Sequence, residues 1–447
     1  MIKKTPWEDF LDFEIKYQMF DFCDENGFPV WDIVRCYVYS KVTAFEAPVS
    51  NSLVDVKNRI VTLIRNIPLL LKWLCSTHKD YFFFLTSRNT IEGKIIDQIA
   101  ASALLELGIK NCYLVESYAD PNDPRLAYSQ KPSPSVADLF RYFVYKKYDF
   151  STIIDIVAKK YPHVNLDEKV MTFMYRRFIG QYKFYYIFFK RRHFKKVFLV
   201  QNNYQKGMFL AARQLGVPTI EFQHGIVNKA HMAYSYPTGY EGLEDRIIVA
   251  DRILSFAPFW FHDVYNPVSS FLPVGNDYLA PKISRDHIDK KSFVVVSANV
   301  FGRPLKDLVG NVMDDSRAVD YKFYFKLHPN QFGQFDEYKN IFKDYPNVEV
   351  ISNQRSMQDL MGIVESMIVI TSTAVYEALY AGVKVFVYKR LSYEVHLDVA
   401  QQKGVYFVDN AKELVDSYEA SRNLEMTPDR HYFSKFDKQA FLDAIKN

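Results

Sequence analysis

From Tyr81 onward the sequence alternates between short apolar runs and amphipathic stretches, with polar loops between them. Residues 81–85 form the first apolar run, and residues 92–107 form a helical stretch that ends at Gly108. Residues 111–115 form the next apolar run. Strand, loop and helix repeated in this order are typical of a parallel sheet with helices on both faces. The pattern therefore predicts an α/β fold with doubly wound sheets.

Later apolar runs extend this alternation in two groups. In the first group we expect a mainly helical stretch at 135–194 and strands at 197–200, 219–222, and either 246–249 or 252–256. In the second group we expect a helix that opens near Pro304 and strands at 293–296, 321–327, 348–351, 367–370 and 384–387. Two such groups predict two sheets in one chain.

The length of 447 residues also favours two domains, because single hydrophobic cores rarely extend beyond about 250–300 residues. The apolar fraction of 49% supplies enough side chains for two cores. Prolines and Gly275 make residues 266–281 the expected linker. We expect two Rossmann-like domains facing across a cleft, with divisions at 1–78 (extra helices), 79–275, 276–430 and 431–447 (a C-terminal helix able to return to the first domain).

Charge and cysteine content narrow the class of protein. The net charge of +4 is small for this length and does not indicate a nucleic-acid partner. The four cysteines show neither a CxxC pair nor zinc-ligand spacing, so we expect reduced thiols and a cytoplasmic protein. Charged residues follow Met1 where a signal peptide would be apolar, and the apolar runs are much shorter than the ~20 residues of a membrane span.

Two basic stretches have two interpretations each. Residues 57–73 are basic and amphipathic, and residues 184–196 interleave aromatic with basic side chains. Both stretches either pack as ordinary helices with solvated basic ends or lie on an anionic lipid surface. The second interpretation predicts a peripheral protein on the inner face of the plasma membrane.

Two predicted strands end abruptly in a histidine. One is followed by Gln223, His224 and Gly225, and the other runs through Lys326 to His328 and Pro329. Ligands of open α/β sheets bind beyond the carboxyl ends of the strands, so both imidazoles are candidate site groups. A histidine there either donates to a phosphate or sugar oxygen, takes a proton from a hydroxyl, or binds a loop carbonyl.

A third strand ends in hydroxyl residues, Thr371, Ser372 and Thr373, immediately before a helix that contains Glu377. Hydroxyls and free N–H groups at a helix N-terminus are suited to a phosphate. Glu377 lies one turn further on and is a candidate acceptor for ribose hydroxyls. Arg303, in the loop 297–303, is a further candidate phosphate contact.

Charged residues near strand ends of the first domain are alternative site groups. Arg88 is a candidate acceptor-side contact, and the carboxylates of Glu92 and Asp97 are candidate bases, although such carboxylates are more often helix caps or surface groups. The sequence contains no HExxH, GxSxG, Walker A or GxGxxG motif and no metal-ligand spacing. We therefore expect neither a metal nor a cofactor.

The histidine-ended strands, together with Thr371-Ser372-Thr373 and Glu377, resemble motifs of bacterial surface-polysaccharide glycosyltransferases with the GT-B fold. Similar groups are capsule and O-antigen transferases, including sialyl- and Kdo transferases, and the teichoic-acid glycerophosphotransferases. The resemblance spans about residues 80–430. The acidic pair of the sialyltransferases is incomplete here, since only Glu92-Gly93 and Glu241-Gly242 come near it.

This resemblance implies a division of roles between the domains. The second domain would bind the phosphate of a nucleotide-sugar through His328, Ser372 and Thr373, with Glu377 near the ribose. Lys326, Arg303 and Thr371 are further candidate donor contacts in the same domain, and the first domain would bind an oligosaccharide or lipid-linked glycan near Gln223, Gly225 and Arg88. His224, Glu92 or Asp97 would be the base of an inverting, metal-independent transfer in capsule, O-antigen or lipopolysaccharide biosynthesis. The alternatives are a CDP-polyol phosphotransferase, a sugar-nucleotide 2-epimerase and a non-catalytic membrane-associated scaffold.

Overall fold

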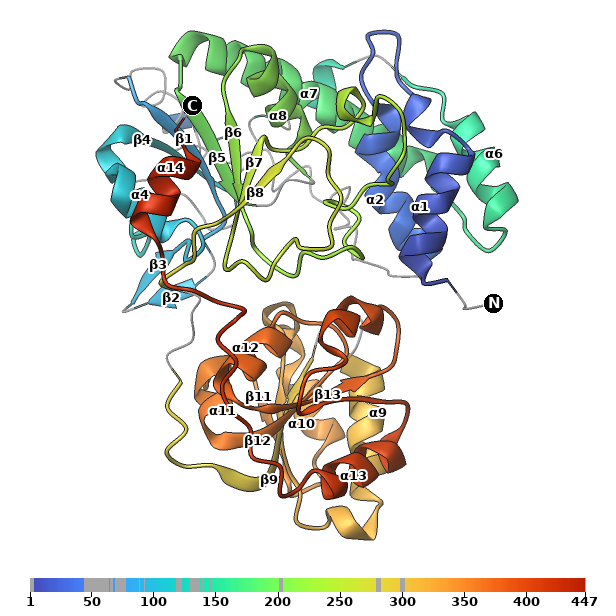
Figure 1. The fold of residues 1–447 in the computed structure, drawn as a ribbon, viewed down its shortest axis with the longest axis vertical. Coiled ribbons are helices and arrows are strands. Elements are labelled where there is room, and N and C mark those ends of the chain that lie inside the picture. Colours follow the sequence, from blue (N-terminus) through green and yellow to red (C-terminus); the bar gives the residue numbers. More distant parts are fainter. Residues whose placement is uncertain are drawn as a thin grey trace. The chain divides into compact units, whose positions relative to one another are not determined.

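The chain forms two compact units, one built from residues 1–44, 48–279 and 434–447, and the other chiefly from residues 280–433. A computed structural model describes residues 4–43, 64, 67–68, 78–87, 89–91, 93–117, 123–128, 137, 140–144, 147–200, 204–278, 283–297 and 302–446. Arg88, Glu92 and nearly all of the basic stretch 57–73 lie outside the described residues. Each unit is a Rossmann-like α/β domain (Figure 1), which confirms the predicted fold class.

The first unit is built on a six-stranded sheet in the order β4-β1-β5-β6-β7-β8, and every pairing is parallel. Continuous apolar runs form its central strands because helices bury both faces of a parallel sheet. The strand bounds are β1 Tyr81–Leu85, β4 Cys112–Glu116, β5 Lys196–Val200, β6 Thr219–Phe222, β7 Arg252–Ser255 and β8 Ser270–Pro273.

Two sequence predictions in this unit are wrong. Residues 89–96, expected to open a helix in part, form the hairpin of β2 (Asn89–Ile91) and β3 (Lys94–Ile96), because Gly93 adopts a φ of 77° at its turn. The helix starts only at α4 (Ala101–Leu107). The expected linker contains β8, whose Phe271 stacks on Phe261 at 4.3 Å between ring centroids.

Helices cover this sheet and include the end of the chain. Helix α7 (Glu168–Arg192) lies against α8 (Lys206–Gln214) at a glycine contact, since a Cβ on Gly207 would be 2.4 Å from the Phe178 carbonyl oxygen. Helix α6 (Ser151–Lys160) precedes α7. The C-terminal helix α14 (Lys438–Ala444) returns to the first unit, where Phe441 packs in the core with Phe198.

The N-terminal helices α1 (Pro6–Lys16) and α2 (Val30–Val42) join this unit through a buried ion pair. The Arg35 guanidinium donates to both Glu14 carboxylate oxygens at 2.8 Å, and Trp31 donates to the same carboxylate at 2.7 Å. Arg35 also donates to the Met232 and Ser235 carbonyls of the loop that follows β6. The ion pair therefore attaches the helices to that loop.

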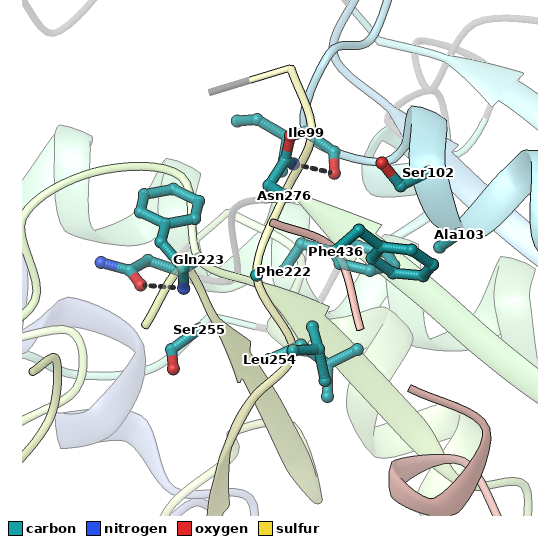
Figure 2. Close-up of a pocket in the computed structure, with 12 residues that line it drawn as sticks. Ile99, Ser102, Ala103, Phe222, Gln223, Leu254, Ser255, Asn276 and Phe436 are labelled. Carbon is teal, nitrogen blue, oxygen red and sulfur yellow. Dashed lines mark hydrogen bonds between the residues drawn. The ribbon is translucent and has the colours of Figure 1, made fainter. Parts of the chain in front are cut away.

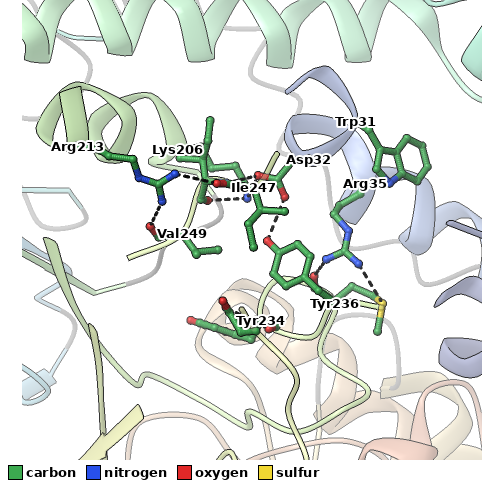
Figure 3. Close-up of polar contacts among 12 residues, drawn as sticks. Trp31, Asp32, Arg35, Lys206, Arg213, Tyr234, Tyr236, Ile247 and Val249 are labelled. Carbon is green, nitrogen blue, oxygen red and sulfur yellow. Dashed lines mark hydrogen bonds and ion pairs between the residues drawn. The ribbon is translucent and has the colours of Figure 1, made fainter. Parts of the chain in front are cut away.

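A second buried ion pair, between Asp32 and Lys206, lies near Arg35 (Figure 3). Asp32 accepts from Lys206 Nζ at 2.7 Å, from the Tyr236 hydroxyl at 3.0 Å and from the Ile248 N–H at 2.8 Å. The Arg35 guanidinium lies over the Tyr236 ring at 4.3 Å. Buried charges are costly unless they are paired and hydrogen-bonded, and both conditions are met here.

The second unit contains a six-stranded parallel sheet in the order β11-β10-β9-β12-β13-β14. Its strands are β9 Asp289–Val296, β10 Lys322–Lys326, β11 Val348–Ile351, β12 Val364–Val369, β13 Lys384–Tyr388 and β14 Val405–Val408, the last of which was not predicted. Its helices are α9 Gly302–Met313, α10 Phe335–Ile341, α11 Met357–Ile363, α12 Ala374–Ala381 and α13 Ala411–Ala420.

Within the part of the chain that the structure describes, no helix has both the length and the apolar character required to cross a membrane. The basic, aromatic stretch 184–196 belongs mostly to α7. Its Phe188 and Phe189 are buried, and both rings contact Phe82 of β1. Lys190 and Arg191 are exposed at the helix C-terminus, where positive charge is favourable. The aromatic half of this stretch is therefore core.

We expect Arg35→Met to lower the free energy of unfolding of the first unit by roughly 3–5 kcal/mol, because it leaves the Glu14 carboxylate buried and unpaired. All four tryptophans precede residue 280, so tryptophan fluorescence during urea unfolding reports on this unit alone. Lys384→Met, which breaks the buried pair with Glu365 in the second unit, is the matched control and should leave that transition unchanged. An unchanged midpoint in Arg35→Met would contradict the assigned role of the pair.

Candidate functional site

The second unit has a topological switch point between β9 and β12. The chain leads from β9 to β10 and β11 on one side, and from β12 to β13 and β14 on the other. Open α/β sheets bind ligands in the crevice outside the strands at this point. The register sets Lys326 level with Val296, and Ile368 level with Val295, so β9, β10 and β12 end together. The segments after these three strands contain the predicted donor-binding residues.

His328 is exposed immediately after β10, and its hydrogen bonds define which ring nitrogen carries the proton. Its Nδ1 accepts the Asn330 N–H at 3.2 Å, because His328 is the N-cap of the 3-10 helix Pro329–Gln334. In the neutral imidazole the proton then resides on Nε2. The structure therefore orients an Nε2–H donor at the end of β10.

Gln331 connects the ends of β9 and β10, and the sequence analysis missed it. Its side chain is 2% exposed, and its Oε1 accepts from Ser297 Oγ at 2.9 Å and from the His328 N–H at 3.1 Å. Its Nε2 donates to the Tyr338 hydroxyl at 3.2 Å. A glutamine three residues after the N-cap forms a capping box, and that spacing was the available sequence signal.

Arg303 lies in the first turn of α9, after β9. It is exposed, and no acidic side chain pairs with it among the described residues. A cation in the first turn of a helix is disfavoured by the helix dipole, so this arginine gains from an anion nearby. Gly302 beside it permits close packing, because a Cβ there would be 2.0 Å from the Tyr338 hydroxyl oxygen.

Lys326 has contacts that differ from the predicted donor contact. Its Nζ donates to the Ser352 carbonyl and, at 2.7 Å, to the Arg355 carbonyl, which ties down the loop after β11. Burial lowers the pKa of this lysine. The structure thus gives Lys326 a loop-holding role, and its contact with a donor stays a prediction.

The hydroxyl segment after β12 forms the start of α12. Ser372 Oγ accepts the Ala374 N–H at 3.2 Å, and the Ser372 N–H donates to Nε2 of His396 at 3.2 Å. His396, a fully buried residue, was not singled out from the sequence. Among the described residues, neither the Ser372 hydroxyl proton nor the Thr373 N–H has a hydrogen-bond acceptor. Thr371 is half-buried beside them. Two donors therefore remain at this helix start.

Glu377 lies one turn into α12 and is half-buried. Burial raises the pKa of its carboxyl group to about 7. Within the described part of the chain, no hydrogen-bond donor or cation contacts this carboxylate. A desolvated carboxylate without a protein partner is suited to accept hydrogen bonds from a ligand.

In the first unit, Gln223 fixes the turn that carries His224. The fully buried Gln223 side chain donates to the Gly225 carbonyl at 2.9 Å and accepts the Phe256 N–H at 3.0 Å. His224 follows at the carboxyl end of β6 and is half-buried. Gln223 therefore fixes the turn that carries His224, and its contact with an acceptor stays a prediction.

A small pocket lies beside this turn, at the carboxyl ends of β6 and β7 (Figure 2). Its polar lining comprises Ser102, Gln223, Ser255 and Asn276, whose amide donates to the Ile99 carbonyl at 2.9 Å. Apart from Ser102 Oγ, these groups bind neighbouring protein atoms. The pocket is part of the scaffold under His224.

Asp97 is buried, and its carboxylate accepts three backbone N–H groups. Thr86 donates at 2.7 Å, Ile99 at 2.9 Å and Ala100 at 3.1 Å. Burial raises the pKa of this carboxyl group despite those hydrogen bonds. The contacts show that Asp97 links the end of β1 to the start of α4. Its role as a base stays a prediction.

The loop after His224 is held by the N-terminal helices. Arg35 binds the Met232 and Ser235 carbonyls, and the buried Tyr234 between them donates to Glu221 of β6, three residues before His224. This set of contacts connects α2 with the strand that carries the candidate base. Among the described residues, no group of three His, Cys, Asp or Glu side chains is arranged as metal ligands.

No protein-family profile matches the sequence, and no characterised protein matches it in sequence. Solved structures similar to the chain include MurG of Acinetobacter baumannii, with 12% identity, a TM-score of 0.49, and coverage of 82% of this chain and 99% of MurG. UDP-GlcNAc 2-epimerase of Methanocaldococcus jannaschii, in complex with UDP-GlcNAc and UDP, has 11% identity and a TM-score of 0.48, with coverage of 82% of this chain and 98% of the epimerase. The spinosyn rhamnosyltransferase SpnG has 10% identity and a TM-score of 0.44, with coverage of 82% of this chain and 95% of SpnG. At these scores the similarity carries no information about substrate.

Two glycines of α9 provide a test of the close packing around Gln331 and Tyr338. Gly302→Ala should destabilise the second unit by about 1–3 kcal/mol, because its Cβ would overlap the Tyr338 hydroxyl and Gln331 Nε2. Gly310→Ala in the same helix is the matched control. Its Cβ would lie 3.6 Å from the Tyr345 hydroxyl, so it should stabilise by up to about 1 kcal/mol through helix propensity. Calorimetric unfolding of both variants measures the difference, and equal effects would refute the close packing at Gly302.

Proposed function

We propose that the chain is a nucleotide-sugar-dependent glycosyltransferase that acts on a bacterial surface glycan. The observation that carries the proposal is a set of hydrogen-bond donors suited to a phosphate at the switch point of the second unit. His328 Nε2–H, the Arg303 guanidinium, the Ser372 hydroxyl and the Thr373 N–H belong to segments after three adjacent strands. Their chemistry is that of a site for a nucleotide phosphate.

Glu377 indicates that the phosphate bound at this site belongs to a nucleotide. A carboxylate close to a phosphate site would weaken the binding of a bare anion through like-charge repulsion. Its presence one turn into α12 is better explained by hydroxyl groups that donate to it, as the two ribose hydroxyls of a nucleotide would. Glu377 therefore favours a nucleotide over inorganic phosphate.

In the proposed reaction the second unit holds the donor and the first unit supplies the base. His224 takes the proton from an acceptor hydroxyl, the resulting oxygen attacks the anomeric carbon, and the bond from that carbon to the phosphate oxygen breaks. His328 and the start of α12 stabilise the negative charge on the leaving phosphate. Direct displacement of this kind inverts the anomeric centre.

The acceptor is proposed from the sequence resemblance and from the charge of the first unit. The exposed Lys183, Lys190 and Arg191 of α7 and the half-exposed Ile187 form a basic, partly apolar face. Such a face suits a glycan attached to a lipid at an anionic inner-membrane surface. Capsule and O-antigen intermediates belong to this class of acceptor.

Two other enzyme classes are alternatives with the same donor site. A phosphopolyol transferase would bind a CDP-linked polyol through the same groups and would attack phosphorus instead of carbon. A sugar-nucleotide 2-epimerase would need no acceptor.

A nucleotide panel and two histidine variants test this proposal. One of CMP, CDP, UDP, GDP or dTDP should raise the Tm of the protein, because a ligand selective for the native state stabilises it. His328→Ala should weaken that nucleotide about tenfold. His224→Ala should leave its affinity unchanged and lower transfer from the corresponding nucleotide-sugar to a bacterial lipid extract by roughly 10²–10³-fold.

Exposed histidines away from the strand ends provide the controls for that experiment. His287→Ala, before β9, and His163→Ala, between α6 and α7, should behave like the unchanged protein. Absence of binding by every nucleotide would refute the proposal. Full transfer by His224→Ala would remove His224 from the mechanism and leave the donor site intact.

The raised pKa of Glu377 predicts a pH-dependent stability. Below about pH 4.5 the group is neutral in both states, and between that pH and its folded pKa of about 7 only the unfolded state ionises, so the folded state loses stability as pH rises. Glu377→Gln should therefore be more stable than the unchanged protein at pH 8, by roughly 1–2 kcal/mol after allowance for partial exposure, and similar at pH 4.5. The measurement is Tm at both pH values. Glu337→Gln, at an exposed carboxylate in the first turn of α10, should show no such difference.

A further inference from the structure

A buried histidine lies directly behind the start of α12. His396 belongs to the 3-10 helix η7 (Tyr393–Val399), after β13, and its side chain is fully buried. Its Nε2 accepts the Ser372 N–H at 3.2 Å. Its ring centroid is 5.9 Å from that of Tyr376 in α12. A segment that follows a different strand thus reaches the loop with the proposed phosphate donors.

The chemistry of this contact requires a neutral ring. Burial lowers the pKa of His396 to about 3, so the imidazole is uncharged at physiological pH. With Nε2 as the acceptor, the ring proton resides on Nδ1, which has no hydrogen-bond partner among the described residues. A buried N–H group without a partner is destabilising, and an apolar side chain would fill the same space without that cost.

That cost is offset by the role of His396 in fixing the conformation of residues 371–373, the loop with the proposed phosphate contacts. By accepting the Ser372 N–H, His396 satisfies a backbone donor that would otherwise turn toward solvent or toward another acceptor. The Ser372 oxygen is in turn held by the Ala374 N–H, so its hydroxyl proton is directed away from α12. The loop is therefore fixed from behind while two of its donors, the Ser372 hydroxyl and the Thr373 N–H, stay available.

We propose that His396 is a positioning residue for the nucleotide phosphate, which acts by holding the Ser372 N–H and does not touch the ligand. This inference rests on the proposed function, because it concerns the same donor site. His396 lies outside the three segments that contain the proposed phosphate contacts. Its contribution to nucleotide affinity would exceed what packing alone gives. A glutamine at this position could supply an oxygen near the place of Nε2, and a leucine could not.

The structure contains a matched control for this proposal. The Tyr376 hydroxyl donates to the Asp398 carboxylate at 2.8 and 3.0 Å, which attaches η7 to α12 through a hydrogen bond separate from that between His396 and the Ser372 N–H. Tyr376→Phe and His396→Leu therefore each remove one attachment of the same segment. Only His396→Leu removes the acceptor of the Ser372 N–H.

The experiment compares His396→Leu, His396→Gln and Tyr376→Phe in the full-length protein. The probe is the nucleotide of the panel CMP, CDP, UDP, GDP and dTDP that stabilises the unchanged protein most, and its Kd is measured by calorimetric titration below each variant's Tm. We expect His396→Leu to weaken binding about tenfold, His396→Gln to restore it to within about threefold, and Tyr376→Phe to leave it within about twofold. Equal weakening by His396→Leu and Tyr376→Phe, or no rescue by glutamine, would overturn the proposal.

A second measurement does not depend on nucleotide binding. In protein labelled with ¹⁵N-histidine, the signal that disappears in His396→Gln should be that of a neutral ring protonated at Nδ1, between pH 6 and pH 8. A ring protonated at Nε2 would show that the contact with Ser372 is absent, and would overturn the positioning role. Failure of every nucleotide to bind the unchanged protein, with the Nδ1–H form observed, would instead refute the proposed function while the contact stands.

Discussion

Parallel strand pairing is the constraint from which the rest of this structure follows. Because all pairings within the two six-stranded sheets are parallel, the carboxyl ends of the strands meet at one edge of each sheet. Residues far apart in sequence, such as Arg303, His328 and Ser372, thereby follow three adjacent strands. An antiparallel order would have sent alternate strand ends to opposite edges. The candidate donor site exists because of that shared direction.

The polar side chains at these edges form two groups, those that bind other groups of the protein and those that we propose contact a ligand. Gln223, Gln331 and Asp97 use their hydrogen-bonding atoms on the protein itself, and each fixes a turn or a helix start. In the proposed site, His328 and Glu377 instead contact the ligand, His328 from the N-cap of the 3-10 helix Pro329–Gln334 and Glu377 through its half-buried carboxylate. The hydrogen bonds of the buried side chains fix the positions of the neighbouring candidate site residues, since a loop without such contacts would sample several conformations.

Buried charge serves the same end in the first unit. The pairs Glu14–Arg35 and Asp32–Lys206 connect α1, α2 and α8 with the loop that follows His224. Apolar contacts alone would hold the helices but would not fix the register of that loop, because hydrophobic burial is not directional. The N-terminal helices are therefore a structural part of the unit that carries His224, and His396 has the corresponding role behind Ser372 in the second unit.

The sequence by itself determined the fold class, most strand positions and the strand-end location of His224, His328 and Ser372, because apolar periodicity and chain punctuation are local properties. It did not determine the hairpin at 89–96, the strand β8 in the expected linker, or the loop contacts of Lys326, since each depends on residues that are distant in sequence. Only the tertiary structure decided which polar groups bind other groups of the protein. That decision rests on partners such as His396 and Gln331, whose burial and hydrogen bonds arise only when separate strands of one sheet come together.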